Sequence, residues 1–119
     1  MKHQIQKVII LPLLFSLVLL TSCEEEQDKT SIEITSPQQG DTFVRGDNVA
    51  ISWTAKGSVY ETFCVVNGST HGRTSSSSGS FTWRAYSTRV GGIEPITAHV
   101  TTENGGDAYH TIYVTVEDN

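Results

Sequence analysis

The sequence of 119 residues has only two cysteines, and after Leu20 it has no long apolar run. No segment after Thr30 shows helical periodicity over three turns, so a helical bundle is not expected. Positive charge is also scarce. Six of the eight Lys and Arg residues and all thirteen Asp and Glu residues lie after residue 22, and that part carries a net charge of −7. Nucleic acid is therefore not expected as a partner, because binding it requires a basic patch.

The first 22 residues are predicted to be a lipoprotein signal peptide. Lys2 and Lys7 flank the start of an apolar run, Val8–Leu20. The run has about 13 residues, fewer than the roughly 20 that a transmembrane helix needs. Leu20-Thr21-Ser22-Cys23 then resembles the lipobox of bacterial lipoproteins, in which the cysteine receives diacylglycerol and becomes the new N-terminus. This resemblance predicts lipidation of Cys23; an ordinary signal peptide with a coincidental cysteine is the alternative.

Residues 23–30 are predicted to be a short acidic tether between the lipid and the domain. Glu24, Glu25 and Glu26 begin it, and a segment this acidic has nothing apolar to bury. These three residues resemble the export tag that sends lipoproteins of some Gram-negative bacteria to the cell surface. The expected location is the outer face of the outer membrane. A plain solvated spacer, with the domain on the periplasmic face, is the alternative.

The remaining cysteine, Cys64, is expected to be a small buried core residue. It lies in the apolar stretch Phe63-Cys64-Val65-Val66. With Cys23 blocked by lipid, no internal disulfide forms, although an envelope location would permit one. A reactive thiol is the alternative.

Residues 31–119 are predicted to form one all-β domain. Apolar and polar residues alternate with period two, and Gly, Asn, Asp and Ser clusters separate the alternating runs. About seven strands at spacings near ten residues indicate an antiparallel β-sandwich. The strands are expected around Ile32 and Ile34, in 42–45, from Val49 to Thr54, in 59–66, from Phe81, around Ile96–Val100 and around Ile112–Val116. The polar segment 70–80 is expected to be a long mobile loop.

The opening of the domain resembles an immunoglobulin-like family. Ile34-Thr35-Ser36-Pro37, Gly40, Gly46 and Val49-Ala50-Ile51-Ser52-Trp53 resemble the yeast cell-wall synthesis (Kre9/Knh1-like) type, and Gly79-Ser80-Phe81-Thr82-Trp83 resembles its second aromatic strand. The resemblance covers residues 31–116 and implies the fold, with no catalytic residues. Trp53 and Trp83 are expected to pack between the sheets, because the Cys-Trp-Cys core of antibody domains is absent.

No catalytic residues, metal site or cofactor are expected, and the protein is not predicted to be an enzyme. No Ser-His-Asp or Cys-His arrangement has a local signature. Arg45-Gly46-Asp47 spells an integrin-binding tripeptide but is better explained as a turn, as is the sequon Asn67-Gly68-Ser69.

Two metal hypotheses have weak support. His99 and His110 are expected nearly opposite each other across the last hairpin, but zinc needs further ligands. Asp41, Asp47 and Asp118 are candidates to converge on calcium, but no loop shows the regular alternation of ligands.

The strongest candidate for binding is a sheet face. Tyr109, Thr111 and Tyr113 alternate with the apolar residues of the last strand and should point outward with His99 of the preceding strand. Such a face suits a glycan or a protein, although Tyr and Thr also cover solvated sheets. The predicted function is a non-enzymatic surface binding or adhesion module. The alternatives are a structural subunit of an envelope complex facing the periplasm, and an inhibitor that presents the loop 70–80.

Overall fold

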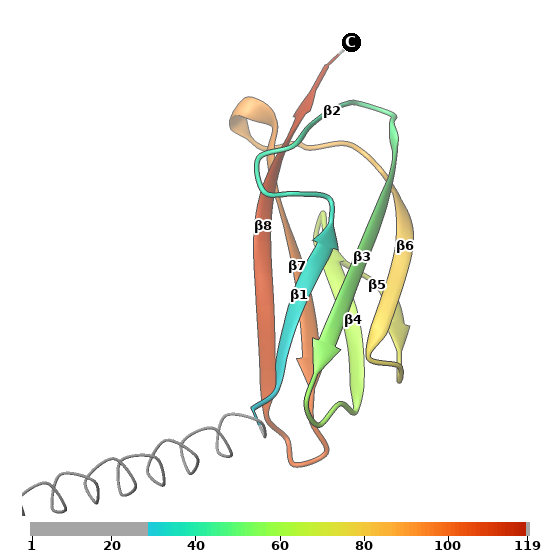
Figure 1. Ribbon diagram of the computed structural model, residues 1–119. Coiled ribbons are helices and arrows are strands. Elements are labelled where there is room, and N and C mark those ends of the chain that lie inside the picture. Colours follow the sequence, from blue (N-terminus) through green and yellow to red (C-terminus); the bar gives the residue numbers. More distant parts are fainter. Residues whose placement is uncertain (1–28, 119) are drawn as a thin grey trace, which may run out of the picture.

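The computed structural model describes residues 29–118, almost all of them in strands or short turns (Figure 1). The predicted signal peptide, Cys23 and Glu24–Glu26 lie outside the described residues. Within 29–118 no helix is long and apolar enough to cross a membrane. The elements are β1 (Ser31–Ser36), β2 (Thr42–Val44), β3 (Asn48–Lys56), β4 (Glu61–Val66), β5 (Ser69–Thr74), β6 (Ser78–Arg84), the 3-10 turn η1 (Val90–Gly92), β7 (Ile93–Thr101) and β8 (Asp107–Glu117).

Two sheets face each other and confirm the predicted immunoglobulin-like β-sandwich. The smaller sheet has the order β1-β3-β6 and the larger has β2-β8-β7-β4-β5. All pairs are antiparallel except the short β2, which runs parallel to β8. The start of β1 and the β7–β8 turn lie at one end of the sandwich, here the proximal end. β2, η1 and the end of β8 lie at the other, the distal end (Figure 1).

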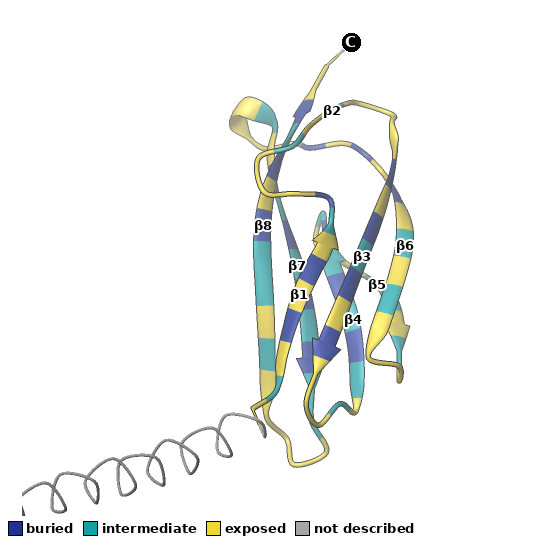
Figure 2. Cartoon of the chain, in the orientation of Figure 1, coloured by how far each residue is buried: buried dark blue, intermediate teal, exposed yellow. Residues whose placement is uncertain are grey.

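The core lies between the sheets and follows the period-two pattern. Buried residues alternate with exposed or partly exposed ones along β1, β3 and β7 (Figure 2). As predicted, Trp53 and Trp83 are buried, with exposed fractions of 1% and 4%, and Cys64 is fully buried. Within residues 29–118, the buried core residues run from Ile32 to Val116. A chain that starts at residue 24 therefore contains all of these residues.

The Trp53 indole is enclosed on several sides. Its Nε1–H donates to Thr62 Oγ1 at 2.9 Å, and that buried hydroxyl donates to the Ser76 carbonyl at 3.2 Å. Gly72 and Gly79 lie against the ring: a Cβ at these positions would come within 2.6 and 2.5 Å of its carbons. Two strands can approach the ring this closely only because both residues lack a side chain.

The expectation of a long mobile loop at 70–80 is wrong. Residues 69–74 form β5 at the edge of the larger sheet, and β6 begins at Ser78. The connecting serines are held by the bond from Thr62 to Ser76 and by Ala55 N–H donating to the Ser77 carbonyl at 2.7 Å. An edge strand without a buried residue needs few apolar residues, so the composition of β5 resembles that of a loop. The inhibitor hypothesis loses the loop on which it rested.

The predicted turns are confirmed. In the tripeptide Arg45-Gly46-Asp47, Gly46 has φ +96°, and Asp47 Oδ2 accepts from Val44 N–H at 2.9 Å. Asn67 and Gly68 both have positive φ and connect β4 to β5, as an Asn-Gly hairpin turn requires.

A methyl group at Gly79 should destabilise the domain because it collides with the enclosed Trp53 ring. For Gly79→Ala in the chain from residue 24 we expect a loss of about 1–3 kcal/mol in the free energy of unfolding, the usual cost of overpacking. Urea denaturation followed by tryptophan fluorescence measures it. The control is Ser80→Ala, at the next and exposed position, which should change stability by less than about 0.5 kcal/mol. Equal stability of the two variants would show that the ring has room to move.

Candidate functional site

The predicted ligand residues share the outer face of the larger sheet, called here the outer sheet face. Tyr109 and Tyr113 are 66% and 50% exposed on β8, whereas Ile112 and Val114 beside them are buried. Thr111 lies between the tyrosines, and its Oγ1 is 2.9 Å from Thr97 Oγ1 on β7. Four residues of a strand span about 14 Å. The two phenol rings therefore mark the ends of a straight track with hydroxyl groups between them.

A row of stacked rings crosses this face at the level of Tyr109. His99 stacks on Phe63 of β4 with centroids 4.9 Å apart, and on Tyr109 with centroids 5.9 Å apart. The Arg73 guanidinium lies 4.6 Å from the Phe63 centroid and pairs with Glu61. The row is therefore a rigid ridge whose inner rings cover each other. Tyr109, at its end, has the most exposed ring.

Phe63 and Arg73 were not predicted for this face. Alternation along β4 places Phe63 on the face opposite to that of the buried Cys64. This pattern would have indicated that Phe63 lies on the outer sheet face. Arg73 had no such signal. Arg73 lies on β5 beside an irregularity in the β4–β5 register, where Gly72 has φ +68°. The place of Arg73 on the sheet therefore depends on how the two strands pair.

His99 and His110 do not lie opposite each other, contrary to the expectation. The register pairs His99 with Tyr109 and His110 with Ala98. A one-residue difference in register reverses the face on which a side chain lies. His110 faces inward, where its Nδ1 accepts from Ile34 N–H of β1 at 3.0 Å and links the two sheets.

The three aspartates proposed for calcium have separate local partners. Asp41 accepts from Gln38 N–H, Asp47 from Val44 N–H, and Asp118 pairs with Arg45 at 3.1 Å. Within residues 29–118 no group of three or more His, Cys, Asp or Glu residues is placed to hold a metal ion.

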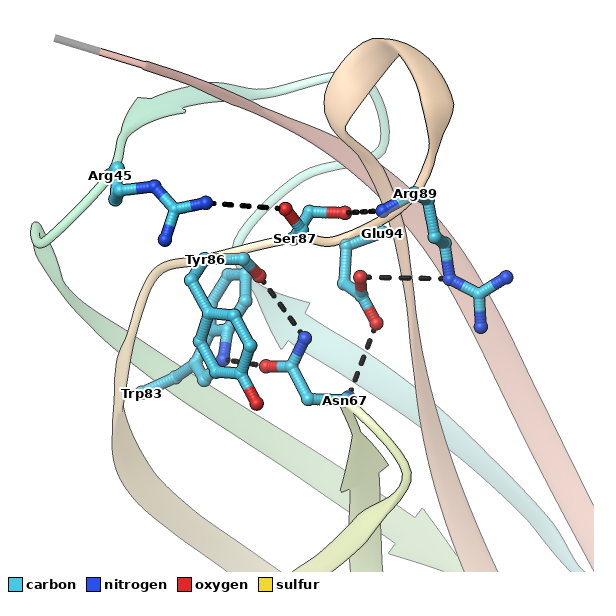
Figure 3. A network of polar contacts seen from close by, with 7 residues as sticks. All are labelled: Arg45, Asn67, Trp83, Tyr86, Ser87, Arg89 and Glu94. Carbon is cyan, nitrogen blue, oxygen red and sulfur yellow. Dashed lines mark hydrogen bonds and ion pairs between the residues drawn. The ribbon is translucent and has the colours of Figure 1, made fainter.

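The distal end contains a polar network that sequence reasoning missed (Figure 3). Glu94 is 2% exposed; its Oε2 accepts from Asn67 N–H at 3.2 Å, and its Oε1 lies 3.6 Å from Arg89 Nε. Asn67 Oδ1 accepts from Trp83 Nε1–H at 2.7 Å, and Asn67 Nδ2 donates to the Tyr86 carbonyl at 3.1 Å. The network joins β4, β6 and β7 and fixes the backbone of Tyr86.

An extension of the alternating pattern would have found two members of this network. Alternation along β7 places Glu94 on the same side as the inward Ile96, Ala98 and Val100, and Glu94 is buried. Alternation after β6 places Tyr86 on the side opposite to Trp83 and Ala85, and Tyr86 is 41% exposed. Their contact with Asn67 comes from strands distant in sequence, and no local pattern indicates it.

No family model matches the sequence, and no curated protein matches it. Among solved structures, the fold is similar to fibronectin(III)-like modules of Clostridium thermocellum CbhA, with a TM-score of 0.61 and 16% identity over 76% of this chain and 47% of that one. It is also similar to SGBP-B of the Bacteroides ovatus mixed-linkage glucan utilization locus, solved with a mixed-linkage heptasaccharide, with a TM-score of 0.51 and 16% identity over 74% of this chain and 24% of that one. The chain thus spans less than half of either structure. At this identity the likeness shows the fold alone.

Cys64 should be chemically inert in the folded domain. Burial raises the pKa of its thiol from 9.0 to about 12, because desolvation disfavours the thiolate. In the chain from residue 24, which has this cysteine alone, we expect no reaction with a chromogenic disulfide reagent at pH 8 until urea unfolds the domain. Thr82→Cys, on the exposed side of β6, should react at once. Immediate reaction of Cys64 itself would contradict the burial.

The same shift gives the domain a pH dependence. Between pH 9 and 12 the unfolded chain loses the thiol proton while the folded chain keeps it, so stability should fall as the pH rises, by up to about 1.4 kcal/mol per unit. Below about pH 8 this thiol is almost fully protonated in both states and contributes almost no slope. Cys64→Ala should lack this contribution when urea unfolding is compared at pH 9 and pH 10.

Proposed function

We propose that this protein is a non-enzymatic, lipid-anchored module at the cell surface that binds an extended glycan along β8. The observation that carries the proposal is the pair of exposed tyrosines, Tyr109 and Tyr113, on one face of one strand. Phenol rings stack on the apolar faces of sugar rings, and their hydroxyl groups form hydrogen bonds. SGBP-B, which shares the fold, was solved with a mixed-linkage heptasaccharide, and this ligand guides the choice of polysaccharides to test.

The track fits a linear ligand better than a compact one. The outer sheet face is open, so a ligand would lie along its surface and contact several residues in a row. Thr111, hydrogen-bonded to Thr97 midway between the tyrosines, keeps further hydroxyl capacity for the ligand. The stacked ridge of His99 and Phe63 holds Tyr109 in place, and ordering a side chain before binding reduces the entropic cost of association.

The glycan hypothesis is tested by affinity electrophoresis of the chain from residue 24 in gels that contain mixed-linkage glucan or other neutral linear polysaccharides. We expect at least one polysaccharide to retard the wild-type chain. Tyr109→Ala and Tyr113→Ala should each weaken binding about 2- to 12-fold, the loss of one aromatic contact. The matched control is Tyr60→Ala, which removes a tyrosine that is 57% exposed just before β4 and away from the track. Equal retardation of the wild type and the three variants would rule out the track as the binding site. Co-purification with an envelope protein, without glycan binding, would favour the role of a structural subunit of an envelope complex.

The surface location is tested by protease accessibility on intact cells. We expect the native chain to be digested, whereas a chain with Glu24, Glu25 and Glu26 replaced by Ala should be protected and become digestible only after the outer membrane is permeabilised. Cys23→Ser is the control for the anchor and should release the protein from the membrane fraction. Protection of the native chain would place the domain on the periplasmic face.

A further inference from the structure

The distal end contains a concave surface whose chemistry differs from that of the outer sheet face. Arg45, Gly46, Arg84, Ala85 and Tyr86 line a hollow of about 530 Å³, called here the distal pocket. Ligand pockets are commonly of this size. Its lining residues include two arginines and a tyrosine and no acidic residue. In a chain with a net charge of −7 after residue 22, this is a local concentration of positive charge.

Arg84 is the cation available to a ligand. Arg45 pairs with Asp118, and Arg89 at the same end pairs with Glu94. Within residues 29–118, no carboxylate lies within ion-pair distance of Arg84. Arg84 is exposed, and a guanidinium can bind a carboxylate through two parallel hydrogen bonds.

Tyr86 lies beside Arg84 on the same side of the chain. Residues 84 to 87 alternate between exposed and buried, so the two side chains share a face about 7 Å apart along the backbone. The backbone beneath them is anchored. Gly46 N–H donates to the Ala85 carbonyl, Ala85 N–H donates to the Asp47 carbonyl, each at 2.9 Å, and Asn67 holds the Tyr86 carbonyl. The ring and the guanidinium are therefore displayed from a fixed frame.

We propose that the distal pocket binds an acidic sugar residue of a polysaccharide, with the Tyr86 ring stacked on the sugar ring and the Arg84 guanidinium paired with its carboxylate. The Arg45 guanidinium, whose pairing with the 84% exposed Asp118 is weakened by solvent, provides a second positive charge. An aromatic ring next to a cation matches a ligand that carries a ring and an anion together. The lining residues Arg45 and Gly46 directly follow β2, which lies at the end of the sandwich opposite the start of β1 (Figure 1).

The test measures binding of the full-length protein, in detergent micelles, to immobilised polygalacturonate, alginate and hyaluronate. Polygalacturonate in its methyl-ester form, which keeps the sugar rings and removes the charge, is the matched neutral ligand. We expect at least one acidic polysaccharide to bind, the methyl ester to bind less, and binding to weaken as salt rises from 50 to 500 mM. Arg84→Gln should lose about 10- to 100-fold and Arg84→Lys less, because lysine keeps the charge without the planar fork. Tyr86→Ala should also weaken binding.

Two controls separate this site from other sources of binding. Lys56→Gln removes an exposed cation at the other end of β3 and should bind as the wild type does. Arg84→Gln should bind the neutral polysaccharides of the outer sheet face as the wild type does, so the two sites fail independently. Binding to none of the three polysaccharides, or equal binding by Arg84→Gln, would overturn the proposal. Equal binding of poly-glutamate with the same dependence on Arg84 would also overturn it, since it would show an anion site without sugar recognition.

Discussion

The enclosure of the Trp53 indole is the constraint on which the rest of the structure depends. The ring fills the space between the sheets, its nitrogen is satisfied by Thr62, and two glycines from β5 and β6 lie directly against it. A tryptophan buries more surface than any other side chain, but it needs a polar partner and a cavity of the right shape. Here three polar or small residues meet that need. They bring the free edges of the two sheets together where His71 of β5 stacks on Phe81 of β6 with centroids 4.5 Å apart.

With the core filled in this way, the remaining side chains are divided between two surfaces. On the larger sheet most inward positions are apolar, and the outward positions in the middle of β7 and β8 carry hydroxyl groups and rings. At the distal end, the connection between β6 and β7 is held by Asn67 and the buried Glu94. A buried carboxylate is costly unless it is hydrogen-bonded and paired, and Glu94 has both an N–H donor and the Arg89 guanidinium. That pairing makes the distal end rigid enough to display Tyr86.

The two surfaces differ in charge as well as in shape. The outer sheet face is a track of hydroxyl groups, and Arg73 beside it is engaged by Phe63 and Glu61. This chemistry suits neutral, extended ligands. The distal pocket is concave and positively charged, and Arg84 has its guanidinium available. Sandwich domains often carry binding residues at the ends of the sheets, where connections vary without disturbing the core.

Much of the fold followed from the sequence by itself. Alternation with period two determined which residues of β3, β7 and β8 point inward, because a strand has only two faces. Asn67-Gly68 determined a tight turn, because these residues tolerate positive φ. The tertiary structure decided which side chains from different strands are neighbours. The register of the last hairpin placed Tyr109, and not His110, beside His99, and a shift of one residue would have reversed this. The polar strand β5 and the contacts of Glu94 likewise depend on partners distant in the chain, and such pairings are set by packing of the whole core and leave no local pattern.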